Sequence, residues 1–401
     1  MASAPSKPTG PLAGVRVLDL TTMVSGPLAT SMMADQGATV MKLEPPGLGD
    51  MMRHIGVTRA GTSAIFHTIN RNKQSLAVNL QKPGGRDTIL KMVPQCDVFV
   101  QNLHPGAVEK LGLDADSLLK INPELIYVSI SGFGGKGPYA DYPAYDIVIQ
   151  ALSGVAVLQA GPERDDPELV NTIFCDKITA VHAAQAICAA LYAREKGRGG
   201  QHIELSLFDA TISFIWPDGM DQLTYLGDGA SKPSSYWALI GINKTRDGYM
   251  TMLPLKDPEF QGLCRALGHT EIAEDARFSE IRSRADNALE LRDLLKPLLA
   301  LQPSESFLER LRAEKVPCAR VVSPDELPDD PQVRAIELLQ ELTTTNSGKL
   351  RTTRPVSQFG GTPAQLRSAG PGLGEHTQQI LEAMGVSTED IKTLRAEGAI
   401  A

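Results

Sequence analysis

Asp176 combines a residue type and a position that suit covalent chemistry. It stands directly before an alanine-rich stretch, AVHAAQAICAALYARE, which predicts a long helix over Lys177–Lys196. As the N-cap of that helix, the carboxylate would accept backbone N–H groups and stay ionised at the positive end of the helix dipole. A nucleophile needs the same conditions, an ionised carboxylate that is fixed and reachable. The pattern alone favours the cap.

Two polar loops are candidates for ligand binding. The segment NRNK, residues 70–73, places two cations and two amides before a strand-like run, SLAVNL, and such a loop suits phosphate. A solvated loop would look the same. The segment GFGGKGP, residues 132–138, follows a strand that ends at Ser131, and glycines there let the backbone approach a ligand. A mobile surface turn is the alternative for this second loop.

Several classes of protein are excluded by what the chain lacks. The first strand-like run is followed by TTMVSGP, which offers one glycine where a dinucleotide fingerprint needs two or three. No G-x-S-x-G, P-loop or H-E-x-x-H motif occurs. The five cysteines form no C-x-x-C pair, and the seven histidines add no ligand-spaced cluster, so we expect no metal and a reducing cytoplasm. The net charge of −8 argues against a nucleic-acid partner.

Strand and helix signals alternate along the first half of the chain. Short apolar runs at 15–20, 39–43, 98–101 and 125–131 predict strands, and the segments between them predict helices. This rhythm indicates an α/β fold with an open parallel, Rossmann-like sheet. We expect a disordered tail over 1–10, a large α/β domain over 11–220, a smaller α+β domain over 221–330 and a return to the large domain over 331–401. No apolar run is long enough to span a membrane, and no signal or transit peptide is evident.

Seven segments, spread over nearly the whole chain, carry a family pattern. They are PLAGVRVLDLTTMVSGPLAT, DQGATVMKLEPPGLGDMMR, NRNKQSLAVNL, CDVFVQNLHPGAVEKLGL, NPELIYVSISGFGGKGPYADYPAYD, FCDKITAVHAAQAICAALYAREKGRGGQHIELSLFDA and VPCARVVSPDELPDDPQV. In this order the chain resembles the family III CoA-transferases of the CaiB/BaiF type, the group that contains formyl-CoA transferase and carnitine CoA-transferase.

The resemblance implies site residues one by one. The catalytic aspartate of the family falls on Asp176, and positions that line its coenzyme A site fall on Val24, Ser25, Pro45, Val78, Asn79, Leu80, Gln81, Asn102, Leu103, His104, Lys110, Pro143, Ala144, Tyr145 and Asp146. Pro45 stands where formyl-CoA transferase has an arginine. The candidate cations for the CoA phosphates are therefore Lys110, Arg71, Lys73 and Arg53. The glycine-rich loop that formyl-CoA transferase closes over its intermediates is replaced here by MLPLKDPEF.

The resemblance also implies a reaction. CoA would pass from an acyl-CoA donor to a small carboxylic acid through aspartyl anhydride and aspartyl-CoA thioester intermediates, with no permanently bound cofactor, in an interlocked homodimer. The related α-methylacyl-CoA racemases use a histidine and a glutamate where this chain has Tyr145 and Lys244. Tyrosine loses its proton only near about pH 10, so a racemase is disfavoured. An acyl-CoA-binding protein without turnover is the remaining alternative.

Overall fold

The computed structural model describes residues 9–161, 166–229 and 238–401. The expected tail over 1–10 lies almost wholly outside these residues. The chain divides into two compact units, the first made of Met1–Asp221 and Glu337–Ala401 and the second of Gln222–Ile336. The limits expected from the sequence, 221 and 330 for the small domain, lie close to this division.

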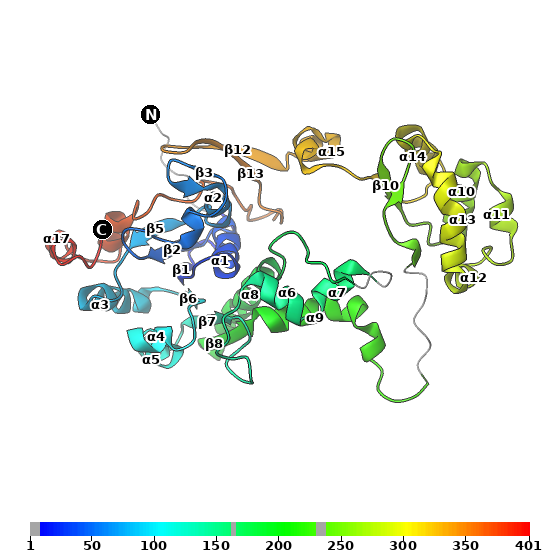
Figure 1. Cartoon of the computed structure of the whole chain (residues 1–401). Coiled ribbons are helices and arrows are strands. Elements are labelled where there is room, and N and C mark those ends of the chain that lie inside the picture. The colour runs from blue at the N-terminus through cyan, green and yellow to red at the C-terminus, as the bar shows by residue number, and fades with distance from the viewer. Residues whose placement is uncertain (1–8, 162–165, 230–237) are drawn as a thin grey trace. The chain divides into compact units, whose positions relative to one another are not determined.

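A six-stranded sheet forms the centre of the first unit (Figure 1). Its order is β5 (Gln74–Ala77), β2 (Thr39–Glu44), β1 (Arg16–Leu20), β6 (Val98–Gln101), β7 (Ile126–Ser131) and β8 (Gln201–Ser206). Every neighbouring pair is parallel, which confirms the predicted α/β class. The chain builds outward from β1 in one direction and then from β6 in the other. The order therefore reverses between β1 and β6, where doubly wound sheets form their ligand crevice.

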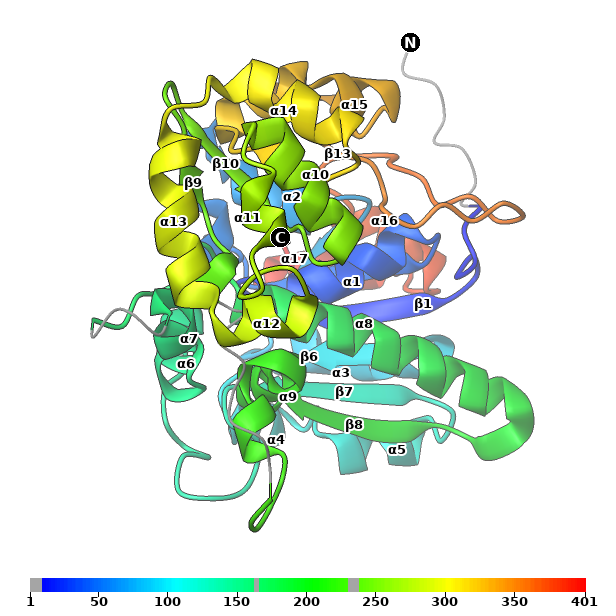
Figure 2. The ribbon, with the colours of Figure 1, turned by 90° about the vertical axis from the view of Figure 1, so that its right-hand side faces the viewer.

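Alternating side chains give this sheet two apolar faces. Val17 and Val98 face α1 (Ser25–Asp35) and α8 (Cys175–Ala193), while Leu18 and Phe99 face the opposite layer. Figure 2 shows α8 lying along β7 and β8. The opposite layer contains α3 (Pro83–Met92), α5 (Ala115–Ile121), α16 (Thr377–Ala383) and α17 (Thr388–Ala396).

The first unit also contains further helices and two short strand pairs. The helices are α2 (Ala64–Ile69), α4 (Ala107–Leu111), α6 (Asp146–Leu152), α7 (Val155–Ala160) and α9 (Leu207–Gly219). The short strands β3 (Thr58–Arg59) and β4 (Thr62–Ser63) form one antiparallel pair, and β12 (Leu339–Thr344) and β13 (Gly348–Thr353) form another. None of the helices in the described parts of the chain is both long and apolar enough to cross a membrane.

The outer edge of β5 is covered by the C-terminal segment. The amide of Ser75 donates to Nδ1 of His376 at 3.3 Å, and the amide of Ala77 donates to the hydroxyl of Thr377 at 3.1 Å. Ile400 forms an antiparallel bridge with Val78 just beyond the strand. The last part of the chain thus closes one side of the sheet.

The second unit is a small α+β domain. Strands β9 (Asn243–Lys244), β10 (Tyr249–Met252) and β11 (Cys318–Arg320) pair antiparallel in the order β11-β10-β9. The unit also contains α10 (Asp257–Leu267), α11 (Glu271–Glu274), α12 (Ile281–Asp286), α13 (Ala288–Ala300), α14 (Ser304–Ala313) and α15 (Pro331–Ala335). A proline inside a helix can kink it or end it early, and Pro297 lies within α13, which continues to Ala300.

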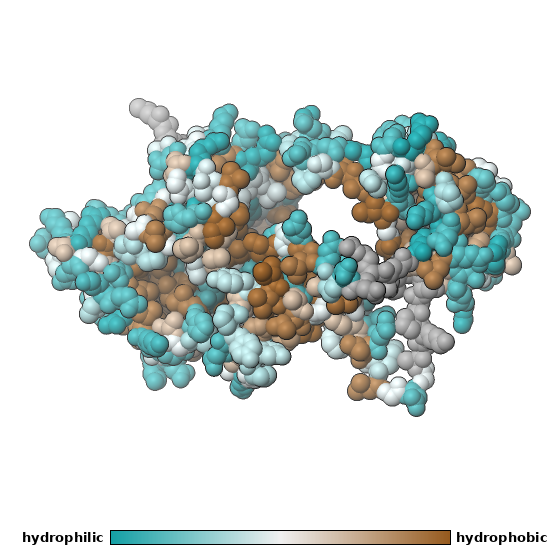
Figure 3. Space-filling model, in the orientation of Figure 1, coloured by the Kyte–Doolittle hydropathy of each residue, from teal (hydrophilic) through white to brown (hydrophobic). Residues whose placement is uncertain are grey.

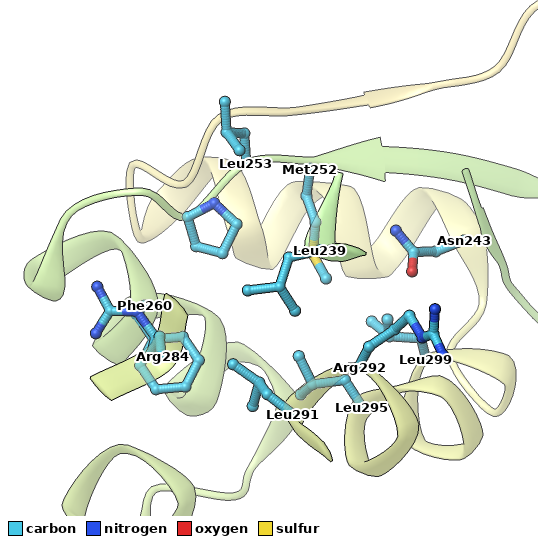
Figure 4. Close-up of a pocket in the computed structure, with 11 residues that line it drawn as sticks. Leu239, Asn243, Met252, Leu253, Phe260, Arg284, Leu291, Arg292, Leu295 and Leu299 are labelled. Carbon is cyan, nitrogen blue, oxygen red and sulfur yellow. The ribbon is translucent and has the colours of Figure 1, made fainter. Parts of the chain in front are cut away.

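A small cavity lies inside this second unit (Figure 4). Its volume is about 30 Å³, and Leu291, Leu295 and Leu299 of α13 form one wall beside Phe260 and Met252. Arg284 borders it with its guanidinium over the ring of Phe260, 4.7 Å from the ring centre. A cavity of this size holds no more than one or two water molecules, so it is no substrate pocket.

Candidate active site

Asp176 does not cap its own helix. The helix α8 begins one residue earlier, at Cys175, and Phe174 occupies the N-cap position without a side-chain hydrogen bond. Asp176 therefore lies in the first turn, and the N-cap favoured by the sequence pattern is wrong. Its carboxylate is only partly buried and remains available for another role.

The missing cap is supplied by Asp146, the first residue of α6. Oδ1 of Asp146 accepts the backbone N–H of Asp176 at 3.0 Å, and its Oδ2 accepts from Nε2 of Gln150 at 2.6 Å. Asp146 is 7% exposed, and both of its carboxylate oxygens have donors. An aspartate from one helix thus satisfies an N-terminal amide of another.

The carboxylate of Asp176 meets a third helix at Ser25. Ser25 is the first residue of α1, whose N-cap residue Val24 makes no side-chain cap. The hydroxyl and the backbone N–H of Ser25 lie near the carboxylate of Asp176 and favour its ionised form. Because the N-terminus of a helix favours an anion, α1 stabilises the ionised form of this side chain.

These surroundings set the protonation of Asp176. Burial raises its pKa first, repulsion from Asp146 raises it further, and the hydroxyl and amide of the nearby Ser25 lower it, for a result of about 6. At neutral pH the group is mostly ionised, yet it is more basic than an ordinary aspartate. An ionised, fixed and partly exposed carboxylate can attack an electrophilic carbonyl carbon.

Most residues that the family resemblance assigns to coenzyme A lie at one edge of the sheet. This is the carboxyl edge, where the parallel strands end. Val24 and Ser25 follow β1, Pro45 follows β2, Val78, Asn79, Leu80 and Gln81 follow β5, and Asn102, Leu103 and His104 follow β6. Thr22 and Asn102 join the loops after β1 and β6 through two hydrogen bonds of 2.8 Å. The loops after β1 and β6 therefore meet where the strand order reverses, and the loops after β2 and β5 follow along the same edge.

Two further segments of the predicted site are in contact with each other. Gly132, just after β7, lies so close to Ala144 that a Cβ atom on the glycine would stand 2.3 Å from that of the alanine. The glycine loop that follows β7 is thereby packed against the segment Pro143–Asp146. Within that segment Tyr145 is exposed, and Asp146 is committed to α8 as described above. Lys110, in the last turn of α4, is exposed.

The polar loop at 70–73 is neither a phosphate site nor a solvated turn. The ammonium of Lys73 is buried and donates to Asp19, to the carbonyl of Pro27 and to Asn70 at 2.7–2.8 Å. Burial lowers the pKa of Lys73 to about 8, with Asp19 acting in the opposite direction. All three ammonium hydrogens are used, so Lys73 has none to offer a phosphate.

Two arginines among the candidate cations have structural partners as well. Arg71 forms a two-pronged ion pair with Asp35 at the end of α1, and it donates to the carbonyl of Thr353 in β13 at 2.6 Å. Arg53 forms a two-pronged pair with Glu44 at 2.7 and 2.8 Å. These pairs join separate segments of the first unit. Of the four proposed cations, Lys110 retains an exposed ammonium.

Residues that the sequence did not single out complete the site. Gln150 positions Asp146, and Thr22 fixes the loop before Ser25. The spacing of Asp146 and Gln150, four residues apart on a predicted helix, is a signal that indicates such a pair. No comparable signal connects Thr22 with Asp50 and Asn102, because both partners lie far from it in the sequence.

Comparison with known proteins shows which family the chain belongs to. The model of CoA-transferase family III matches residues 12–377. Acetyl-CoA:oxalate CoA-transferase of Acetobacter aceti is 34% identical, over 93% of this chain and 95% of its own length. Succinate--glutarate CoA-transferase of Agrobacterium fabrum is 32% identical, over 92% of this chain and 95% of its own.

Solved structures give the same result. A CaiB/BaiF family protein from Brucella suis superposes with a TM-score of 0.80 at 30% identity, covering 94% of this chain and 100% of its own. A hypothetical protein from Mycobacterium tuberculosis gives a TM-score of 0.81 at 30% identity, with the same coverage of both chains. With a matching family model, fold and relatives, this chain belongs to CoA-transferase family III and is an enzyme of the EC 2.8.3 type.

Proposed function

We propose that this enzyme transfers CoA from an acyl-CoA to a small carboxylic acid, with Asp176 as its nucleophile. The observation that carries the proposal is the contact between the carboxylate of Asp176 and Ser25 at the start of α1. That contact lies beside the loops at the carboxyl edge, where open α/β sheets bind ligands. It keeps the carboxylate ionised and fixed without enclosing it.

The reaction follows from carboxylate nucleophilicity. An oxygen of Asp176 attacks the donor thioester carbonyl, the C–S bond breaks, and CoA leaves as a thiolate from a mixed anhydride. The thiolate then attacks the aspartyl carbonyl of that anhydride, which releases the donor acid and leaves an aspartyl-CoA thioester. The acceptor carboxylate attacks this thioester and forms a second anhydride with release of the thiolate. Attack of the thiolate on the acceptor acyl carbon yields the new acyl-CoA and restores Asp176.

The chemistry of the acceptor is suggested by the relatives. Their names include the dicarboxylic acids oxalate and glutarate. We therefore place a small dicarboxylic acid first among the acceptors of this enzyme. Each thioester formed replaces one that is consumed, so the exchange requires no nucleotide triphosphate.

For coenzyme A we propose the loops that follow β1, β2, β5 and β6, together with Lys110 and the exposed His104. In support, these loops share one edge of the sheet, and Lys110 offers the cation that Arg71 and Lys73 do not. A phosphate bound at an exposed lysine is held by charge rather than by a rigid fork of donors.

We also propose a homodimer in a reducing cytoplasm. Apolar side chains are exposed on consecutive helices of the first unit, including Ile147 on α6, Val157 on α7, Val181 on α8 and Phe214 on α9. Figure 3 shows apolar surface over this region. Exposed apolar surface of this kind is typical of a protein interface. All five cysteines are free thiols, which fits a reducing compartment.

Trapping of the covalent intermediate tests the proposed function. The enzyme is incubated with succinyl-CoA, treated with hydroxylamine and digested, and the peptides are analysed by mass spectrometry. We expect a hydroxamate on Asp176 and none in Asp176→Asn. Unmodified Asp176 during measured CoA transfer would overturn the nucleophile assignment. Exchange of the substrate α-proton with deuterated water, without transfer, would instead identify a racemase.

A further inference from the structure

The loop that leads to Ser25 carries backbone strain. Met23 has a φ of +65°, in the left-handed region that residues other than glycine rarely adopt. The loop Thr21–Val24 joins β1 to α1, so the conformation of Met23 decides where α1 begins. Strain of this kind persists only where the surroundings hold the backbone firmly. Two side chains, those of Asp50 and Asn102, hold the backbone of this loop.

Asp50 holds two consecutive residues of this loop. Its Oδ1 accepts from the hydroxyl of Thr22 at 2.9 Å and from the amide of Met23 at 3.2 Å. Its Oδ2 pairs with Nζ of Lys42 at 2.8 Å, and the same Nζ donates to the carbonyl of Thr21 at 2.9 Å. Lys42 is fully buried and Asp50 is 4% exposed. One buried ion pair thus contacts three residues of the loop.

Asn102 holds the loop from the neighbouring strand. It is the first residue after β6, and its Oδ1 accepts the amide of Thr22 while its Nδ2 donates to the carbonyl of the same residue, both at 2.8 Å. The side chain therefore binds Thr22 as a paired strand would. Thr22 is fixed through its amide, its carbonyl and its hydroxyl together.

We propose that Asp50 and Asn102 are positioning residues, which hold the strained loop Thr21–Val24 so that Ser25 meets the carboxylate of Asp176. The proposal rests on the proposed role of Asp176 and extends it to groups beneath the site. Asp50 is too deeply buried to contact a substrate. A buried ion pair is seldom a source of net stability, and fixing a single conformation is one use that has been found for such pairs.

A displaced Ser25 would leave a measurable mark on Asp176. The charged group that acts on Asp176 is Asp146 from α6, while α1 contributes the uncharged Ser25. Burial and Asp146 raise the pKa of Asp176, and Ser25 opposes them. Loss of the Ser25 contact therefore moves the titration of Asp176 to higher pH.

Two variants test the proposal, with one matched control. Thr22→Val removes one hydrogen bond to Asp50 without changing any charge, and Asp50→Asn removes the charge that pairs with Lys42. The control is Asp35→Asn, which breaks another buried ion pair, that with Arg71 at the far end of α1. Asp176 is titrated by carboxyl ¹³C NMR in aspartate-labelled protein, and its signal is assigned by its absence in Asp176→Asn.

We expect the midpoint of Asp176 to rise by about one pH unit in Thr22→Val and Asp50→Asn, the effect of losing one hydrogen bond to a charged group. We expect kcat to fall about tenfold or more. Asp35→Asn should leave both quantities as in the wild type. A wild-type titration of Asp176 in Thr22→Val would overturn the proposal, even if Asp50→Asn does not fold.

The titration does not depend on turnover. If the wild-type protein fails to transfer CoA while the midpoint of Asp176 still moves in Thr22→Val, the proposed function is wrong and the positioning of Ser25 stands. If transfer proceeds and the midpoint does not move, the positioning role alone is wrong.

Discussion

The backbone N–H of Asp176 donates to the carboxylate of Asp146 at 3.0 Å, across the starts of two different helices. Two carboxylates therefore lie side by side at the carboxyl edge with different surroundings. That of Asp146 is occupied by donors from α8 and from Gln150, whereas that of Asp176 meets Ser25 and remains partly exposed. The arrangement leaves one carboxylate for chemistry and uses the other to hold it in place.

Replacing Asp146 with asparagine should make Asp176 more acidic. The asparagine oxygen can still accept the N–H of Asp176, but the negative charge that raises the pKa of Asp176 is gone. We expect the acid limb of the pH profile of kcat/KM to move to lower pH by up to about one unit. Gln150→Leu removes a hydrogen bond to Asp146 but keeps its charge, so this variant should not move the limb to lower pH. Movement of the limb to higher pH in Asp146→Asn would contradict the assignment.

Asp176 should reduce stability at neutral pH. Burial, together with Asp146, holds its folded-state pKa at about 6, above the ordinary value of 3.8. The folded protein therefore binds this proton more tightly than the unfolded chain, and stability falls as the pH rises from 4 to 6. Asp176→Asn has no carboxylate at this position, so this fall in stability with pH is absent. Relative to the wild type, the variant should gain about 2 kcal/mol of unfolding free energy between pH 4 and pH 8.

Urea unfolding of both proteins at pH 4 and pH 8 measures this difference. If Asp176→Asn loses CoA transfer but is more stable than the wild type at pH 8, the negative charge of Asp176 serves the reaction at a cost in stability. An equal pH dependence in the wild type and in Asp176→Asn would mean that the group titrates as an ordinary aspartate.

The contact between Gly132 and Ala144 should not tolerate a methyl group. A Cβ on Gly132 would stand 2.3 Å from that of Ala144, so Gly132→Ala must push the glycine loop away from the segment that carries Asp146. We expect a loss of about 1–3 kcal/mol in stability and a fall in kcat of about tenfold to a hundredfold. Gly135→Ala is the matched control, because its nearest neighbour is an oxygen of Glu204 at 3.9 Å. Equal activity of the two variants would refute this view of the contact.

Variants of Lys73 and Lys110 should distinguish a cation that stabilises the fold from one that binds a phosphate. Lys73→Met leaves the carboxylate of Asp19 buried without its cation and should cost about 3–5 kcal/mol in stability, with an unchanged KM for acyl-CoA in the folded enzyme. Lys110→Ala should leave stability unchanged and raise that KM severalfold, less so at high salt. Lys120→Ala, at the exposed end of α5, is the control for Lys110. A raised KM in folded Lys73→Met would restore Lys73 as a phosphate ligand.

Local patterns predicted much of the architecture. The limits of β6 agree with the run 98–101 expected from the sequence, because an apolar run is recognised within a few residues. The reversal of strand order between β1 and β6 was not predicted in that detail. The helix α9 was missed, and it contains Pro217.

The candidate site could be predicted only in part. The position of Asp176 before an alanine-rich helix was evident, but its partners Asp146 and Ser25 come from other helices, and no local pattern connects them. The loop at 70–73 shows the same limit. Its charges are typical of a surface turn, yet Asp19 and Asp35 pair with Lys73 and Arg71 and bury most of the loop. Burial of a charge depends on distant partners, which a single sequence does not identify.

The cover over β5 has a consequence for biosynthesis. The amides of Ser75 and Ala77 are bonded by side chains that are synthesised some three hundred residues later, near His376. Until then, this strand presents open backbone donors to any other nascent or misfolded chain. A nascent chain that lacks the last helices would therefore expose this strand to intermolecular pairing, and docking of the C-terminal segment covers it.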